Sequence, residues 1–318
     1  MQAIILSPSS LGSIATCTTK AWLSKACGLT TKEESAALKA GSAGHAGLEV
    51  FYRSKGDQDG AKLRFEEEYR AWAIDNVLSD NARSWENTRD VFEGLVDGMD
   101  VDRLPYTWEP GEVECHLTAS LGVFEGVEVS LQGYVDLPVR ERGTGSRYIM
   151  DHKFTGWLKS DTVEGYKLAA QFKAYAWLWE EVKAEAVAGV YVNAVEWSKL
   201  PGVRYTKAGS EYKCRTHGVG YSECRLLHAN KQLVPLTLFP EDIALWKANA
   251  EGLVARYAWY VARYGEEGLD AVQYMPMEGT FGAGCLWCEF KRFCRSGRQK
   301  GLGESMFVAR ESREGDGR

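Results

Sequence analysis

Three side chains that are suited to metal chemistry lie close together in the middle of the chain. Asp151 and Lys153 are two residues apart in the segment RYIMDHK, and Asp136 ends the segment GYVD. Side chains two apart on a strand project from the same face. Two carboxylates can bind a hard cation such as Mg²⁺, and a lysine can orient water or offset charge on a phosphate. The pattern therefore predicts a metal site at the end of two strands.

A simpler interpretation of the D-x-K pair is a surface salt bridge at a strand end. Acidic and basic residues alternate on many exposed strands, so Asp151 and Lys153 can pair with each other without any further role. Further metal ligands and motifs elsewhere in the chain would favour the metal site over the salt bridge.

The neighbouring elements are predicted from periodicity and turn residues. A segment rich in glycine and charge, 138–146, predicts an antiparallel hairpin between strands at 127–136 and 147–153. Another strand is predicted over 112–117, and an apolar one at 188–195 can lie buried in the sheet. A helix is predicted over 161–182 from its apolar spacing, and Asp161 with Glu164 resembles a capping box at its start.

Helices and a hairpin region are expected on both sides of these strands. Ser7 and Pro8 introduce a first helix that includes Cys17. In the second, Gly41, Gly44 and Gly47 are three apart, which costs stability and indicates the close approach of another backbone. The other segments are two helices within 60–104, a β-hairpin region at 200–238, a long helix from Pro240 whose apolar stripe is expected in the core, and a disordered tail after Gly301.

Composition limits the class of protein. The chain has 318 residues, of which 45 % are hydrophobic and 26 % charged, which is typical of a globular protein with one large domain or two. It contains no run of about 18 apolar residues, so we expect no membrane-spanning helix. The N-terminal segment lacks the basic region of a signal peptide, so a cytoplasmic location is expected.

The net charge of −6 does not suggest a nucleic-acid-binding protein, because such proteins usually carry a basic surface. Any such function must depend on local basic patches. Two sets of basic residues are candidates for a patch or for a solvated face: Arg204, Lys207, Lys213 and Arg215, and then Lys291, Arg292, Arg295, Arg298 and Lys300.

Three of the eight cysteines have the spacing of metal ligands. In a cytosolic chain cysteines are read for metal binding before disulfides, and GCLWCEFKRFC holds Cys285, Cys288 and Cys294 in the pattern C-x2-C-x5-C. A zinc site or an iron–sulfur cluster normally takes four ligands. The first candidate for the fourth is Cys17 and the second is Cys27, and either cofactor would join the first helix to the last.

Six segments of the chain together resemble one family. They are LSPSSLGSIATCTTKAWL, GSAGHAGLE, GYVD, DHK, QFKAY and CLWCEFKRFC. In this order they resemble the motifs of RecB-like PD-(D/E)-x-K nucleases with an iron–sulfur staple. That group includes four-cysteine CRISPR-associated exonucleases, nuclease domains of bacterial helicase–nucleases and phage relatives. The resemblance spans about residues 6 to 296.

The resemblance implies an α/β fold with a restriction-endonuclease-like core, a mixed central sheet flanked by helices. An N-terminal helical region and a C-terminal helix would be closed by the iron–sulfur staple. It also implies a single nuclease domain over 1–300, with the parts at 53–105 (helical), 106–198 (core), 200–238 (β-hairpin region) and 240–296 (C-terminal helix and staple), followed by a tail at 301–318.

The resemblance also assigns roles to individual residues. His45, Asp136 and Asp151 resemble the side-chain ligands of Mg²⁺ or Mn²⁺, and neutral imidazole can complete such a site. The main-chain carbonyl of His152 would be a further ligand, and Lys153 resembles the lysine that positions the attacking water. Asp151 stands where most relatives have glutamate, which has a longer reach.

Two more sets of residues match the family. Gln171 and Tyr175 form its Q-x-x-x-Y pair and, being four apart, share one face of a helix, where they would orient the DNA strand. The 4Fe-4S ligands would be four cysteines: Cys17, Cys285, Cys288 and Cys294. The proline that usually follows the first cysteine of the family is missing here.

The function implied is that of a divalent-metal-dependent DNA nuclease, an exonuclease on single-stranded ends in recombination, CRISPR adaptation or phage DNA processing. DNA and recombination, helicase or CRISPR-adaptation proteins would be its partners, and it could form homo-oligomers. The alternative is a non-catalytic DNA-binding or scaffold protein that retains the fold and the cluster. The complete set of metal ligands and the lysine favour the enzyme.

Overall fold

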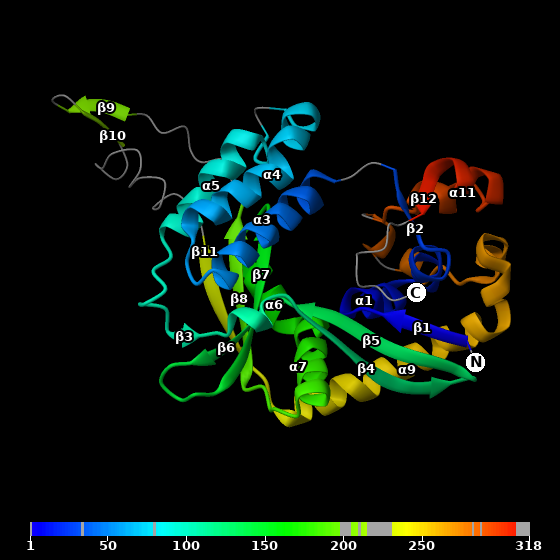
Figure 1. Ribbon diagram of the computed structural model, residues 1–318. Coiled ribbons are helices and arrows are strands. Elements are labelled where there is room, and N and C mark those ends of the chain that lie inside the picture. The colour runs from blue at the N-terminus through cyan, green and yellow to red at the C-terminus, as the bar shows by residue number, and fades with distance from the viewer. Residues whose placement is uncertain are drawn as a thin grey trace.

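A five-stranded mixed sheet forms the centre of the computed structural model, which describes residues 2–32, 35–78, 81–197, 205–208, 211–214, 231–281, 283–286 and 288–309. The strand order is β11-β8-β7-β6-β3, with β7 and β8 parallel and the other pairs antiparallel. The bounds are β3 (Tyr106–Thr107), β6 (Leu137–Glu141), β7 (Arg147–Thr155), β8 (Gly189–Glu196) and β11 (Lys231–Thr237). Helices flank the sheet, which confirms the predicted α/β class (Figure 1).

The two faces of β7 contact two different hydrophobic clusters. Ile149 belongs to a cluster with the buried residues of α7 and α9, whereas Met150 belongs to a cluster with those of α3, α4 and α5. By the two-residue period of a strand, Asp151 and Lys153 project toward the α7 side and His152 toward the α3 side. These helices are α3 (Ala36–Arg53), α4 (Gln58–Asn76), α5 (Trp85–Asp97), α7 (Ala170–Lys183) and α9 (Pro240–Tyr264).

The predicted hairpin between 127–136 and 147–153 is wrong. The first of these segments forms β5 (Val127–Val135), which pairs antiparallel with β4 (Cys115–Phe124) and parallel with β1 (Gln2–Leu6) in a separate three-stranded sheet. The antiparallel partner of β7 is β6, and all of β6 after Leu137 lies in the segment predicted as a turn.

The error has a physical reason and a consequence for the site. Leu137 and Val139 are fully buried, so this stretch forms a strand despite Pro138 and the nearby glycines. Asp136 is the single residue between β5 and β6. It therefore lies where the chain passes from one sheet to the other.

The first helix begins as predicted and ends earlier than predicted. The side chain of Ser7 caps α1 (Pro8–Thr16) by accepting a hydrogen bond from Ser10 N at 3.3 Å. Cys17 has extended backbone and lies between α1 and α2 (Thr18–Ala21), not within the helix. Thr18 explains the break, because its N and Oγ1 each donate a 2.8 Å hydrogen bond to Glu278. These bonds join the start of the chain to its C-terminal part.

The predicted helix from Asp161 is two helices, α6 (Ser160–Leu168) and α7, which are separated at Ala169. The predicted capping box is wrong, because Lys159 is the N-cap and no side chain caps the helix. The reason is packing: α6 buries none of its residues, whereas α7 buries six, so the chain bends where its apolar face meets the sheet.

The C-terminal part contains more regular structure than predicted. In the region 200–238, β9 (Tyr205–Ala208) and β10 (Glu211–Cys214) form a hairpin, and β11 joins the central sheet; residues 200–204, 209–210 and 215–230 lie outside those described. The tail predicted to be disordered includes α11 (Lys300–Met306) and β12 (Phe307–Ala309), and residues 310–318 lie outside those described.

Aromatic packing explains the order of this tail. Phe307 is 4 % exposed and packs against Phe290 and Phe293, while β12 pairs with β2 (Leu29–Thr31). Between α9 and the tail are short helical segments: Gly265–Tyr274, Glu278–Phe281, Ala283–Cys285 and α10 (Lys291–Arg295). Among the described residues, no helix has the length and apolar character needed to cross a membrane.

The glycines of α3 differ in their surroundings. A Cβ at Gly47 would overlap the Phe92 ring of α5 and lie 2.9 Å from the carbonyl oxygen of Ala61 on α4. A Cβ at Gly44 would overlap the Phe154 ring of β7, and one at Gly41 would meet nothing within 4 Å. The predicted close approach of another backbone therefore holds at Gly47 alone of the three.

We expect Gly47→Ala to lower the free energy of unfolding by about 1–3 kcal/mol, because the added methyl group overpacks the contact with α4 and α5. The control is Gly41→Ala on the same helix, which should raise that free energy by up to about 1 kcal/mol because alanine favours the helix. Urea unfolding followed by circular dichroism measures both. Equal effects of the two substitutions would contradict the packing at Gly47.

Candidate active site

Asp136 is the centre of a partly buried polar cluster. Its Oδ2 accepts a 2.7 Å hydrogen bond from the backbone N–H of His152 on β7, and His45 Nδ1 lies 3.4 Å from the same oxygen. Its carbonyl oxygen accepts a 2.9 Å hydrogen bond from Glu114 N. The junction of the two sheets thus holds this carboxylate from both its backbone and its side chain.

His45 reaches the cluster because α3 packs closely on β7. Gly44 lets the ring of Phe154 lie against the helix, and the His45 ring then lies 5.7 Å from that of Phe154, edge to face. The side chain of His152 points to the same side, stacks on Tyr52 at 5.4 Å and accepts a hydrogen bond from Asn193 Nδ2 at 2.9 Å. A side chain larger than glycine at residue 44 would move His45 away from Asp136.

Asp151 and Lys153 lie on the opposite face of β7, next to α7. Lys153 Nζ lies 2.6 Å from Asp151 Oδ2, and Gln171 Nε2 donates a 3.3 Å hydrogen bond to Asp151 Oδ1. Gln171 Nε2 also lies within hydrogen-bond distance of Tyr175 Oη, at 3.2 Å. Gly133 on β5 makes room for this tyrosine, since a Cβ there would lie 2.9 Å from its Cε1. The structure thus brings the predicted residues of β7 and α7 together.

Glu114 is a candidate ligand that the sequence did not single out. Its Oε1 lies 3.8 Å from His45 Nδ1, and a ligand atom each from His45, Glu114 and Asp136 can lie within 4.8 Å of one another. Its φ is +52°, a backbone conformation that non-glycine residues rarely adopt and that often marks functional sites. The register of β4 with β5 places it opposite Asp136, so pairing the strand at 112–117 with 127–136 would have identified it.

Burial and like charge raise the pKa of both aspartates. Burial is the largest effect at Asp151, whose pKa is raised to about 6 even though Lys153 lowers it. Burial also raises the pKa of Asp136, and Glu114 raises it further. Each carboxylate would therefore be stabilised by additional positive charge.

The basic groups respond in the opposite sense. Burial disfavours the charged form of His45, but Asp136 and Glu114 outweigh it and raise its pKa to about 9. The pKa of Lys153 is also raised, because Asp151 and Asp136 outweigh its burial. His152 is different, since burial lowers its pKa well below the usual range and keeps it neutral.

The four predicted cysteine ligands line one small cavity. Cys17, Cys285, Cys288 and Cys294 surround a space of about 20 Å³, and Cys27 is not among the lining residues. Burial raises the pKa of the Cys294 thiol to about 11, and the other three thiols add to the effect. This arrangement fits a shared metal centre, with Cys17 as the fourth ligand.

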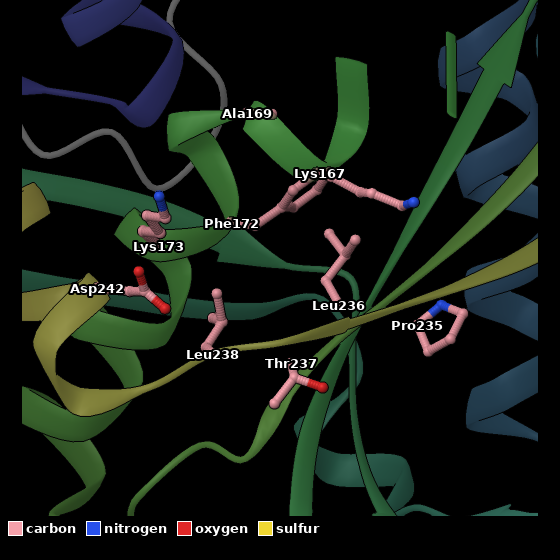
Figure 2. A pocket seen from close by; sticks show the side chains of 9 residues that line it. All are labelled: Lys167, Ala169, Phe172, Lys173, Pro235, Leu236, Thr237, Leu238 and Asp242. Carbon is pink, nitrogen blue, oxygen red and sulfur yellow. The ribbon is translucent and has the colours of Figure 1, made fainter. Parts of the chain in front are cut away.

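A larger pocket lies apart from the predicted site residues. Its volume is about 250 Å³, and Figure 2 shows Phe172, Lys173 and Asp242 among its lining residues. It contains none of the predicted site residues. Its link to the site is Phe172, whose ring centroid lies 5.9 Å from Lys153 Nζ. The pocket is therefore a neighbour of the site and not its centre.

The structure describes the side chains of only one of the two basic sets from the sequence. The side chains of the first set lie outside the described residues. In the second set, Arg298 donates hydrogen bonds to the carbonyl oxygens of Val272 and Met275, and Lys300 pairs with Asp270. At least these two basic residues contribute to the folding of the C-terminal part.

The motif order and this geometry agree with a family comparison. The profile of the PD-(D/E)XK nuclease superfamily matches residues 5–295. The chain belongs to this superfamily. No curated protein matches the chain significantly.

Two solved structures resemble this superfamily member distantly. A candidate exonuclease from Eubacterium rectale has a TM-score of 0.47 at 12 % identity, over 82 % of each chain. The crystal structure of SSO0001 has a TM-score of 0.32 at 13 % identity, over 74 % of this chain and 80 % of that chain. Neither likeness carries an argument about function.

PD-(D/E)XK nucleases typically use divalent metals, and the cluster around Asp136 fits such an ion. Its donors are carboxylate oxygens and one imidazole, which suit Mg²⁺ and Mn²⁺. Asp151 Oδ2 is buried and pairs with Lys153 Nζ at 2.6 Å, and a carboxylate oxygen that accepts from one donor keeps a further lone pair. A buried oxygen with free acceptor capacity and raised carboxyl pKa values both favour a bound cation.

We expect Mn²⁺ binding near pH 7.5 to release about one proton, because a metal requires neutral imidazole and the pKa of His45 is about 9 without metal. Calorimetry in buffers of different ionisation enthalpy measures the release. His45→Asn should bind Mn²⁺ more weakly and lose most of the proton release. A heat of binding that is the same in every buffer would contradict this assignment.

Proposed function

We propose that this chain is a divalent-metal-dependent deoxyribonuclease that hydrolyses phosphodiester bonds. The observation that supports this most is the convergence of His45, Asp136, Asp151 and Lys153 from α3, the sheet junction and β7. A surface salt bridge would explain Lys153 beside Asp151 but not a histidine and a second carboxylate beside them. Membership in the PD-(D/E)XK nuclease superfamily supports the same chemistry.

The proposed mechanism gives the metal and Lys153 different roles. His45, Asp136 and Asp151 would hold Mg²⁺ or Mn²⁺, with Glu114 and the main-chain carbonyl of His152 as further ligands. A bound ion of this kind lowers the pKa of water and stabilises charge on phosphate oxygens. The pKa of Lys153 is raised, so its ammonium stays protonated and can donate a hydrogen bond to the attacking water.

The remaining predicted residues would orient the reactants. Gln171 donates to Asp151 and so fixes the direction in which its other oxygen points. Gln171 and Tyr175 would also position the DNA strand, so that water attacks the phosphorus in line with the departing sugar oxygen. The bond to water forms as the phosphorus–oxygen bond breaks, and the departing oxygen takes up a proton.

The proposal extends to the type of substrate and setting. The enzyme would be an exonuclease on single-stranded ends, acting in recombination, CRISPR adaptation or phage DNA processing with a helicase or adaptation partner or as a homo-oligomer. The motif order of the RecB-like group supports this part.

Cys17, Cys285, Cys288 and Cys294 would hold a 4Fe-4S cluster with a structural role. The four thiols line one cavity, and Thr18 beside Cys17 bonds to Glu278. The cluster would therefore join the two ends of the chain at a place where hydrogen bonds already connect them.

We expect Lys153→Ala to lower the cleavage rate of end-labelled DNA in Mn²⁺ by about 10²- to 10⁴-fold, because the attacking water loses its hydrogen-bond donor. The control is Lys300→Ala, whose ammonium pairs with Asp270 on the C-terminal part of the chain. The lengths of the labelled products separate exonuclease from endonuclease cleavage. Full activity of Lys153→Ala would refute the proposed mechanism.

The cysteine assignment predicts a contrast between two variants. Protein purified without oxygen should be brown, Cys17→Ser should lose most of the visible absorption, and Cys27→Ser should keep it, because Cys27 is outside the cavity. Absorption spectra and iron and zinc analysis measure this. A colourless protein with stoichiometric zinc would show a zinc staple instead.

A further inference from the structure

An exposed tryptophan lies directly after the strand that carries the predicted catalytic residues. Trp157 is 60 % exposed, whereas the next residue, Leu158, is 6 % exposed and packs in the core. A chain extends at most about 3.6 Å per residue, so the Cα atoms of Trp157 and Lys153 are at most about 14 Å apart. A large aromatic surface therefore faces solvent within a few nucleotides of the cleavage chemistry.

Hydrogen bonds fix the backbone of this tryptophan. The hydroxyl of Thr155 accepts from Trp157 N at 3.2 Å and donates to Trp157 O at 3.1 Å, and Thr162 Oγ1 of α6 donates to the same carbonyl at 3.1 Å. The residue is thus tied both to the end of β7 and to α6. The exposed indole is held on a fixed support and does not belong to a free loop.

One cationic side chain borders the indole, and a second lies against the preceding glycine. Lys159 Nζ lies 4.2 Å from the centre of the Trp157 ring, and Arg83 lies against Gly156, where a Cβ would be 2.6 Å from its Nη2. Arg83 Nε is buried and has no hydrogen-bond partner in the part of the chain that is described. In a protein with a net charge of −6, this local positive charge beside an aromatic face is suited to a nucleotide.

We propose that Trp157 is a stacking site for one unpaired nucleobase of the DNA strand, with Lys159 attracting the adjacent phosphate. This inference rests on the proposed nuclease function and names the side chain that would hold the single strand near the site. A base in a duplex is already stacked on both faces, whereas an unpaired base has a face free for the indole. Stacking is sequence-tolerant, because every base has such a face.

The test is the affinity of a fluorescein-labelled single-stranded oligodeoxynucleotide, measured by anisotropy with Ca²⁺ as the only divalent ion. Trp157→Ala should weaken binding by about five- to 100-fold, and Trp157→Phe by less, because a ring remains. Lys159→Gln should lower the slope of log affinity against log salt by about 0.7. The wild type and Trp157→Ala should bind equally to a closed circular duplex, in which every base is stacked on both faces.

The matched control is Trp259→Ala. Trp259 on α9 is 42 % exposed and has Arg263 Cζ 5.5 Å from its ring centre, yet α9 contributes no residue to the site, so this variant should bind like the wild type. An oligonucleotide series with one abasic position gives an independent readout. Loss of the base at one position of the oligonucleotide should weaken its binding to the wild type but not to Trp157→Ala.

Equal affinity of Trp157→Ala and the wild type for single strands would overturn the stacking site, as would a wild type that binds only duplex. Equal losses in Trp157→Ala and Trp259→Ala would also overturn it. A wild type that cleaves no DNA in Mn²⁺ would refute the proposed nuclease instead. The binding measurement does not require hydrolysis and distinguishes the two failures.

Discussion

The central constraint in this molecule is the burial of two carboxylates beside each other. Burial raises the pKa of Asp136 and Asp151, and the like charge of Glu114 on Asp136 and of Asp136 on Asp151 raises each further, so their ionised forms need positive charge or hydrogen-bond donors nearby. Lys153, His45 and the N–H of His152 supply these from β7 and α3. Such a site is more costly to build than an apolar core, and a divalent cation would relieve that cost.

The arrangement depends on two sheets that meet at one residue. Because β5 ends at Val135 and β6 begins at Leu137, Asp136 lies between two sheets. The three-stranded sheet packs on α7 and α9, and the central sheet packs on these helices with one face and on α3, α4 and α5 with the other. Three glycine and aromatic contacts then set the distances: Gly44 with Phe154, Gly47 with Phe92, and Gly133 with Tyr175. A small residue at each of these places lets a helix approach a strand or another helix.

Much of the fold and of the candidate site could be predicted from the sequence. Residue types two or four apart on one element keep their relation in any tertiary arrangement, so spacing alone predicts Asp151 beside Lys153. The same spacing puts Gln171 and Tyr175, which the family motif singles out, on one helix face. The same holds for the cap at Ser7 and the buried strand β8. The order of the family motifs added His45, which no local rule connects with Asp136. The structure places His45 beside Asp136 and the four cysteines around one cavity.

The sequence by itself determined which residues carry charge, which thiols are closely spaced and which segments alternate. Only the tertiary structure decided that β6 is the partner of β7, that Glu114 lies opposite Asp136, that Cys17 and not Cys27 lies on the cysteine cavity, and that Phe307 orders the tail. Strand pairing and the approach of distant segments depend on which apolar faces bury each other. That is a property of the whole core, which no short stretch of sequence contains.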